Sequence, residues 1–151
     1  MIYREATLED LSPKGVDLVA EGMQEVTLGE EAFSPDRSLE TLIRMVNDPG
    51  CLVGVADTGN TLAGVIIASA YDSMFSDSIY ATMHVWYVRP AHRGGWTGYR
   101  LARIYRDWAH LIGAKTAYMD VNSGVDNEMA SKLAYKLGFR QIGTTHKAMF
   151  Q

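Results

Sequence analysis

The most informative segment of this chain reads Val85-Trp86-Tyr87-Val88-Arg89-Pro90-Ala91-His92-Arg93-Gly94-Gly95-Trp96-Thr97-Gly98-Tyr99-Arg100-Leu101. The β-branched and aromatic residues before Pro90 predict a strand. Pro90 and the Gly94-Gly95 pair predict a turn. From Leu101 onward, apolar residues recur at helical spacing, so we expect a helix directly after the turn.

The start of that helix is a candidate anion site. Backbone N–H groups in a first helical turn have no intrahelical acceptor, and the helix dipole favours negative charge there. Phosphate is the usual ligand of such a site. Arginines gather in and after the turn, at positions 89, 93, 100, 103 and 106. Because the whole chain has a net charge of −4, this local positive charge indicates a polyphosphate ligand.

Length and composition predict one globular domain over residues 1–151, with 47% hydrophobic and 21% charged residues. The isoelectric point near 5.5 argues against broad nucleic-acid binding. Cys51 is the only cysteine, and the charged start of the chain does not look like a signal peptide. We therefore expect a cytoplasmic protein. No apolar run approaches the roughly 18 residues of a membrane span, so no membrane partner is expected.

The rest of the chain divides into helices and strands by its apolar spacing and turn residues. Helices are expected from Pro13, with Ser12 as N-cap, to about Val26; from an N-cap at Ser38 to Val46; and over residues 127–137. Residues 28–37 are expected to form a loop, and Thr7 and Asp10 have the spacing of a capping box. Strands are expected at residues 2–6, 51–56, 62–70, 79–88 and 115–121, and residues 139–150 are expected to add one strand or two short ones.

The connection between the strands at 79–88 and 115–121 contains a helix. It is too long for a hairpin and fits a parallel pair. The predicted fold class is therefore α/β (α+β): a mixed, mostly antiparallel sheet with a parallel pair at its middle and helices on its faces. Ligands of such sheets favour the carboxyl ends of the parallel strands, where the arginine-rich turn is expected.

Two groups of residues resemble signatures of the GNAT family of N-acetyltransferases. The first group is Val88, Pro90, Arg93, Gly94, Gly98 and Leu101, and the second is Asn127, Ala130, Leu133, Gly138 and Phe139. Both occur in the family's order and on the expected elements, and the resemblance extends over nearly the whole chain.

The resemblance implies an acetyl-CoA-dependent N-acyltransferase that acts directly on a small-molecule or peptide amine. It places the pyrophosphate on the turn and the pantetheine arm along the strand, where the two parallel strands splay apart near Val88 and Val121. The cofactor-binding residues it implies are Trp86, Tyr87, Val88, Arg93, Gly94, Gly95, Trp96, Thr97, Gly98, Tyr99 and Asn127. A backbone N–H near Tyr87 or Val88 would stabilise the oxyanion.

The chain departs from the family pattern at two positions. Trp96 replaces a glycine, and its ring either covers the ligand or packs on the sheet, while Gly94 and Gly95 supply the necessary backbone freedom. Ala134 replaces the tyrosine that usually serves as general acid. Tyr135 is the adjacent candidate acid, but one helical step turns it by about 100°.

His84 is the first candidate for the general base, because its unperturbed pKa is near 6.5. It shares a face with Thr82 and Trp86 if no bulge intervenes. It could instead be a half-buried, hydrogen-bonded histidine. Asp120 on the next parallel strand could act as base in its place, or could face solvent.

The remaining candidates are polar residues in connecting segments. Asn127 could bind the pantetheine arm or cap its helix. Glu30 and Glu31 lie where the family usually roofs the acceptor site, and they could attract a cationic amine or simply be solvated. No spacing of metal ligands is present. A non-catalytic acyl-CoA-binding module or interaction domain is the alternative function, and a homodimer is possible, as in other family members.

Overall fold

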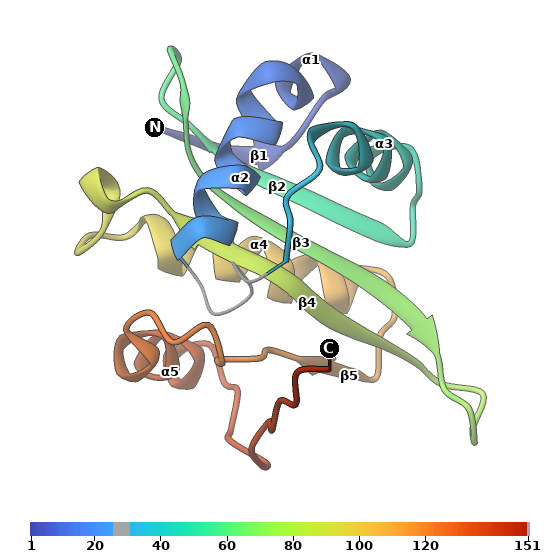
Figure 1. Ribbon diagram of the computed structural model, residues 1–151. Coiled ribbons are helices and arrows are strands. Elements are labelled where there is room, and N and C mark those ends of the chain that lie inside the picture. Colours follow the sequence, from blue (N-terminus) through green and yellow to red (C-terminus); the bar gives the residue numbers. More distant parts are fainter. Residues whose placement is uncertain (26–30, 151) are drawn as a thin grey trace.

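The computed structural model describes residues 1–25 and 31–150, and its centre is a five-stranded mixed sheet (Figure 1). The strands are β1 (Ile2–Glu5), β2 (Cys51–Asp57), β3 (Leu62–Asp72), β4 (Ile79–Val88) and β5 (Thr116–Tyr118). They lie in this order, antiparallel from β1 to β4, with β5 parallel to β4. The predicted mixed, mostly antiparallel fold class is therefore confirmed, but the parallel pair β4–β5 lies at one edge of the described sheet and not at its middle.

Helices cover both faces of the sheet. They are α1 (Leu8–Asp10), which continues through the π-helical turn η1 (Leu11–Gly15) into α2 (Val16–Glu25), and then α3 (Pro35–Val46), α4 (Thr97–Leu111) and α5 (Asn127–Lys136). A 3₁₀ turn, η3 (Pro90–His92), follows β4. α2 and α3 lie on one face, and α4 crosses the other (Figure 1). None of the described helices is both long and apolar enough to span a bilayer.

Alternating side chains of the central strands fill two apolar layers. Val53 and Val65 pack with α2 and α3 on what we call the α3 face. Leu52 and Ile66 pack with Tyr105 on what we call the α4 face. Because successive strand residues point to opposite faces, one continuous apolar run can serve both layers.

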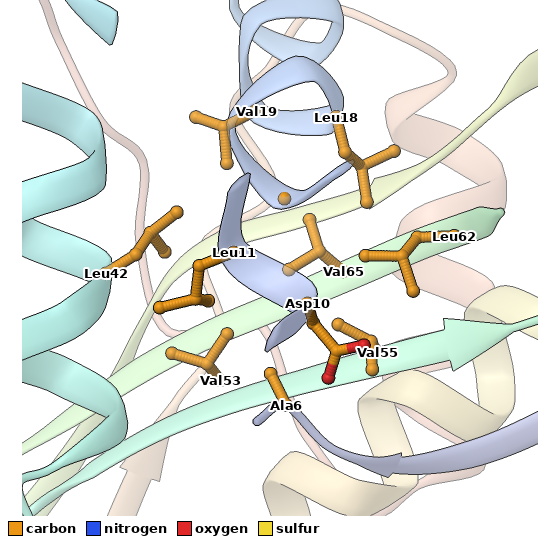
Figure 2. A pocket seen from close by; sticks show the side chains of 11 residues that line it. Ala6, Asp10, Leu11, Leu18, Val19, Leu42, Val53, Val55, Leu62 and Val65 are labelled. Carbon is orange, nitrogen blue, oxygen red and sulfur yellow. The ribbon is translucent and has the colours of Figure 1, made fainter. Parts of the chain in front are cut away.

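A small apolar cavity lies in the core of the α3 face (Figure 2). Its volume is about 10 Å³, which is room for one water at most. Asp10 is the charged residue in its lining, and Arg4 binds that carboxylate at 2.7 and 2.9 Å. The backbone N–H of Thr7 donates to Asp10 at 2.7 Å, as the predicted capping box requires. This cavity is a packing defect beside an ion pair, and it cannot hold a substrate.

Two helix starts differ from the sequence prediction. Ser12 has non-helical dihedral angles inside η1, so the regular helix α2 begins at Val16. Ser34 caps α3 in place of Ser38, because its Oγ accepts the N–H of Arg37 at 3.2 Å. Ser34 precedes a proline at the first helical position, which favours an earlier start.

The carboxyl-terminal strand prediction is wrong. Residues 139–150 form no strand, and β5 has only three paired residues in place of the predicted 115–121. Phe139 stacks on Tyr105 at 6.2 Å, but residues 140–150 are exposed. Three residues offer a short edge, so little is available for a further strand to pair with.

Candidate functional site

The loop before α4 presents a row of backbone donors. Gly94 adopts a positive φ of 83°, whereas Trp96 has φ −91° and ψ −4°, which suits any residue. Gly94 therefore provides the conformational freedom that the family signature places at position 96. Within the described part of the chain, the N–H groups of residues 94–99 donate no hydrogen bond to the protein. They form a cradle for an anion at the start of α4.

Trp96 does not pack on the sheet. Its side chain is 64% exposed, and its ring meets Tyr99 edge to face at 5.6 Å. The packing alternative is therefore wrong, and the ring lies beside the cradle. Whether it covers a ligand stays a prediction.

Arg93 is tied to the protein by its guanidinium. Its terminal nitrogens bind both oxygens of Glu25 at 2.5 and 2.6 Å, and Nε donates to the carbonyl of Val88 at 2.7 Å. It also lies over the ring of Tyr87, 5.4 Å from its centre. Arg93 holds the pKa of Glu25 below its usual value. The side chain thus joins the end of α2 to the end of β4, and its phosphate contact stays a prediction.

The outer edge of β4 is open over its second half. Pairing with β5 ends at Thr82 and Tyr118, so the strands part earlier than the predicted point near Val88 and Val121. Arg89 donates its N–H to Ala63 on β3 at 2.8 Å. Since backbone groups alternate along an antiparallel pair, Tyr87 also faces β3. The N–H and C=O of Trp86 and Val88 therefore face the open edge.

Trp86 closes the side of this opening that faces α4. Its indole N–H donates to the carbonyl of Gly98 at 3.1 Å. A Cβ at Gly98 would lie 3.5 Å from Leu133 of α5 and 3.7 Å from the Trp86 ring. Gly98 thus lies where β4, α4 and α5 meet, which explains why both family signatures converge there.

A β-bulge sets the direction of His84. Ile67 lies opposite Val85 and Ala68 lies opposite Met83, so His84 is an extra residue of β4 without a partner. The extra residue leaves His84 on the α3 face, whereas Trp86 packs on the α4 face. The predicted shared face is therefore wrong for Trp86. It holds for Thr82, which pairs opposite Ser69 on the α3 face.

A chain of hydrogen bonds supports the His84 ring. His84 Nε2 lies 2.9 Å from Ser69 Oγ, Ser69 Oγ lies 3.7 Å from Cys51 Sγ, and the thiol donates to Asp48 at 3.6 Å. One proton assignment satisfies all three contacts: Ser69 donates to Cys51, and His84 Nε2–H donates to Ser69. Nδ1 then holds the lone pair that can accept a proton.

Burial lowers the pKa of His84 below its ordinary value of 6.5, and the nearby charge of Asp120 partly offsets this effect. The imidazole is therefore neutral at pH 7 and can act as a base. Asp120 itself is exposed. His84 is exposed as well, so the structure brings both base candidates close enough to interact, and both are open to solvent.

A groove of about 400 Å³ runs between α3 and the strands beside His84. Its lining is Val19, Arg37, Ser38, Thr41, Leu42, Arg44, Met45, Ile67, Ser69, Tyr71, His84 and Val85. Sequence reasoning missed Ser69, Arg37 and Arg44. The seven-residue spacing of the two arginines on a predicted helix was the available signal.

The other candidates are less closely placed. Tyr135 is 57% exposed while Ala134 is buried, as the predicted rotation requires. Asp126, and not Asn127, is the N-cap of α5, and Asn127 accepts the N–H of Gly124 at 3.2 Å. Glu31 is exposed and does not line the groove, and Glu30 lies outside the described residues. No group of described side chains has the composition of a metal site.

Comparison with known proteins decides the family. The sequence profile of the Acetyltransferase (GNAT) family matches residues 19–139. The chain belongs to the GNAT family. Solved structures agree in fold. A putative acetyltransferase from Agrobacterium tumefaciens has a TM-score of 0.76 at 16% identity, with 99% of this chain and 100% of that chain covered.

Two further structures of similar fold are enzymes whose names state an acceptor. The glucosamine-6-phosphate N-acetyltransferase of Arabidopsis thaliana has a TM-score of 0.76 at 13% identity, with 99% and 98% of the chains covered. An aminoglycoside 6'-N-acetyltransferase of Acinetobacter haemolyticus has a TM-score of 0.72 at 17% identity, with 100% and 99% covered. At these identities the likeness concerns the fold.

Proposed function

We propose that this GNAT protein transfers an acetyl group from acetyl-CoA directly to an amine. One observation carries the proposal. The open edge of β4 begins at the anion cradle and leads to the bulge at His84. This arrangement joins a phosphate site, an extended backbone edge and a neutral base in one line.

The residues present fit acetyl-CoA. The unbonded N–H groups of residues 94–99 would hold its pyrophosphate. The outward N–H and C=O groups of Trp86 and Val88 would pair with the amides of its pantetheine arm, as an added strand does. Thr97 and Gly98 are the first two residues of α4, and Asn127 is the first residue of α5.

The chemistry requires a neutral amine, an oxyanion donor and an outlet for the thiolate. Acetyl-CoA supplies a thioester: the amine forms a C–N bond to its carbonyl carbon, the C–S bond breaks, and CoA leaves as a thiolate. His84 Nδ1 accepts the proton that the amine loses. An outward backbone N–H of β4 that the pantetheine arm leaves free would donate to the oxygen of the tetrahedral intermediate. A thiolate is a tolerable leaving group because thiols are acidic, with a pKa of about 8.5 for the cysteine side chain.

A non-catalytic acyl-CoA-binding module is the second candidate. It is favoured by one observation: Ala134 carries no hydroxyl at the position of the usual acid, and Tyr135 points to solvent. Both functions use the same cradle, so they differ in turnover and not in acetyl-CoA affinity.

Calorimetric titration with acetyl-CoA and with free CoA tests the shared part of the proposal. An amine panel with detection of released thiol then tests turnover. An enzyme binds and releases thiol in an amine-dependent manner, and His84→Gln keeps the affinity but loses the release. Binding without release by any amine assigns the module. Absence of binding overturns both functions.

A further inference from the structure

The charged residues that line the groove beside His84 are two arginines of α3. Arg37 and Arg44 both border it, seven residues apart. Seven residues are close to two helical turns, so the side chains leave the same helix face about 10 Å apart along the axis. His84 is the other basic side chain of the lining, and it is neutral at pH 7 because burial lowers its pKa. The groove therefore carries a net positive charge.

Neither guanidinium is neutralised by an acid of the described chain. Salt bridges among residues 1–25 and 31–150 involve Arg4, Arg89, Arg93 and Arg103, but not Arg37 or Arg44. Within these described residues, Arg100, Arg106 and Arg140 form no salt bridge either, so Arg37 and Arg44 are distinguished by their place in the groove and not by the lack of a carboxylate. Arginine favours planar, bidentate binding of carboxylate and phosphate.

Asp48 is the first acidic residue after Arg44 in the sequence. Its two oxygens bind other groups and not the Arg44 guanidinium. One oxygen accepts the N–H of Gly50 at 2.8 Å, and the other accepts the thiol of Cys51. Burial raises the pKa of that thiol, while the charge of Arg44 acts in the opposite direction. Arg44 therefore lies near the hydrogen-bond chain that supports His84.

We propose that the acceptor of this GNAT protein is an amine that also carries an anionic group, a carboxylate or a phosphate. The proposal rests on the transferase function proposed above and names its substrate class. The amine lies at His84, and the anion lies along α3 on Arg44 and Arg37. The neutral wall between them, formed by Ser38 and Thr41, offers hydroxyl groups to the connecting part of the acceptor.

The sequence-based role of Glu30 and Glu31 predicted a cationic acceptor, whereas the present proposal requires an anionic group on it. Glu31 is exposed outside the groove lining, whereas the groove itself is basic. A simple cation such as a polyamine would meet two unpaired arginines there. Like charges at close range disfavour such a complex.

Matched pairs of probes test the proposal. One pair is glucosamine 6-phosphate and glucosamine, and the other is lysine and cadaverine, which lacks only the carboxylate. Binding is measured by calorimetry without acetyl-CoA and again with free CoA, and turnover by thiol release. The variants are Arg37→Gln, Arg44→Gln and their combination. Arg106→Gln, an exposed arginine of α4 on the other face, is the control.

The expected result is that at least one anionic probe binds about tenfold more tightly than its neutral partner. The preferred pair identifies the anion as phosphate or carboxylate. Arg44→Gln and Arg37→Gln reduce this preference, and Arg106→Gln leaves it unchanged.

Three results overturn the proposal: equal or tighter binding of both neutral probes, a preference that survives in the double variant, or no binding of either anionic probe at about 10 mM. These results are separate from the transferase function, because that function fails only if acetyl-CoA does not bind or no amine releases thiol.

Discussion

Replacement of His84 by glutamine is the sharpest test of the catalytic site. Glutamine keeps a hydrogen-bonding side chain beside Ser69 but cannot accept a proton at neutral pH. A positioned general base contributes roughly 10²–10⁴-fold, so kcat/KM at pH 7.5 should fall by about that factor. The affinity for acetyl-CoA should stay constant, because His84 lies on the α3 face, away from the phosphate cradle.

The pH dependence gives the same test a direction. The active form of His84 is neutral, so log kcat/KM should rise with pH, and its slope should decrease by one above the pKa of His84. Burial places this pKa below 6.5, and the charge of Asp120 raises it again in part. Asp120→Asn removes that charge, so the acid limb should move to lower pH than in the wild type. With one acceptor in both proteins, the titration of the acceptor amine cancels from the comparison.

The assay follows the loss of thioester absorbance between pH 5 and pH 8 at saturating acetyl-CoA. His110→Gln, an exposed histidine of α4, is the control for the loss of a histidine. Full kcat/KM in His84→Gln would refute the base assignment. A shift of the acid limb to higher pH in Asp120→Asn would refute the electrostatic coupling between the two residues.

Three further predictions concern stability and the cradle. Asp10→Asn should lower the free energy of unfolding at pH 7 by about 2 kcal/mol, because it breaks charged hydrogen bonds to Arg4. The folded-state pKa of Asp10 lies below its ordinary value of 3.8, so in urea denaturation the difference should be full above pH 3.8 and vanish toward lower pH. Gly64→Ala should lower the melting temperature, through overpacking of about 1–3 kcal/mol, since its Cβ would lie 2.7 Å from the Tyr87 carbonyl oxygen; an unchanged melting temperature would contradict this. Arg93→Ala should weaken acetyl-CoA binding roughly tenfold in calorimetry if its guanidinium reaches the pyrophosphate, and equal affinity would leave it a structural residue only.

The parts of the fold that the sequence predicts are those with strong local signals. β2, β3 and β4 are β-branched runs bounded by turn residues, and their observed bounds differ from the predicted ones by at most two residues. α5 begins at the predicted Asn127, because the polar loop before it and the helical apolar spacing after it are also strong local signals. β2, β3 and β4 pair in chain order because short loops join them.

The parts that escape prediction depend on distant partners. Residues 139–150 have an apolar pattern that suits a strand, but a strand also needs an edge to pair with, and β5 offers only Thr116–Tyr118. The pairing of Arg93 with Glu25 joins residues 68 positions apart. A motif places Arg93 in the turn correctly, but it does not state which acid of α2 its guanidinium meets.

The acceptor side depends on a single inserted residue. The negative charge of Glu30 and Glu31 suggested that the acceptor is a cation. The sequence did not show which surface borders His84. The shared helix face of Arg37 and Arg44 could be read from their spacing. The sequence could not show that this helix face borders His84. Trp86 packs on the α4 face, and because residues two apart in a regular strand share a face, His84 would be expected there too. The bulge reverses that expectation, and it alone puts the base in the same groove as the arginines. The acceptor charge that we propose therefore depends on strand register, which a local pattern does not determine.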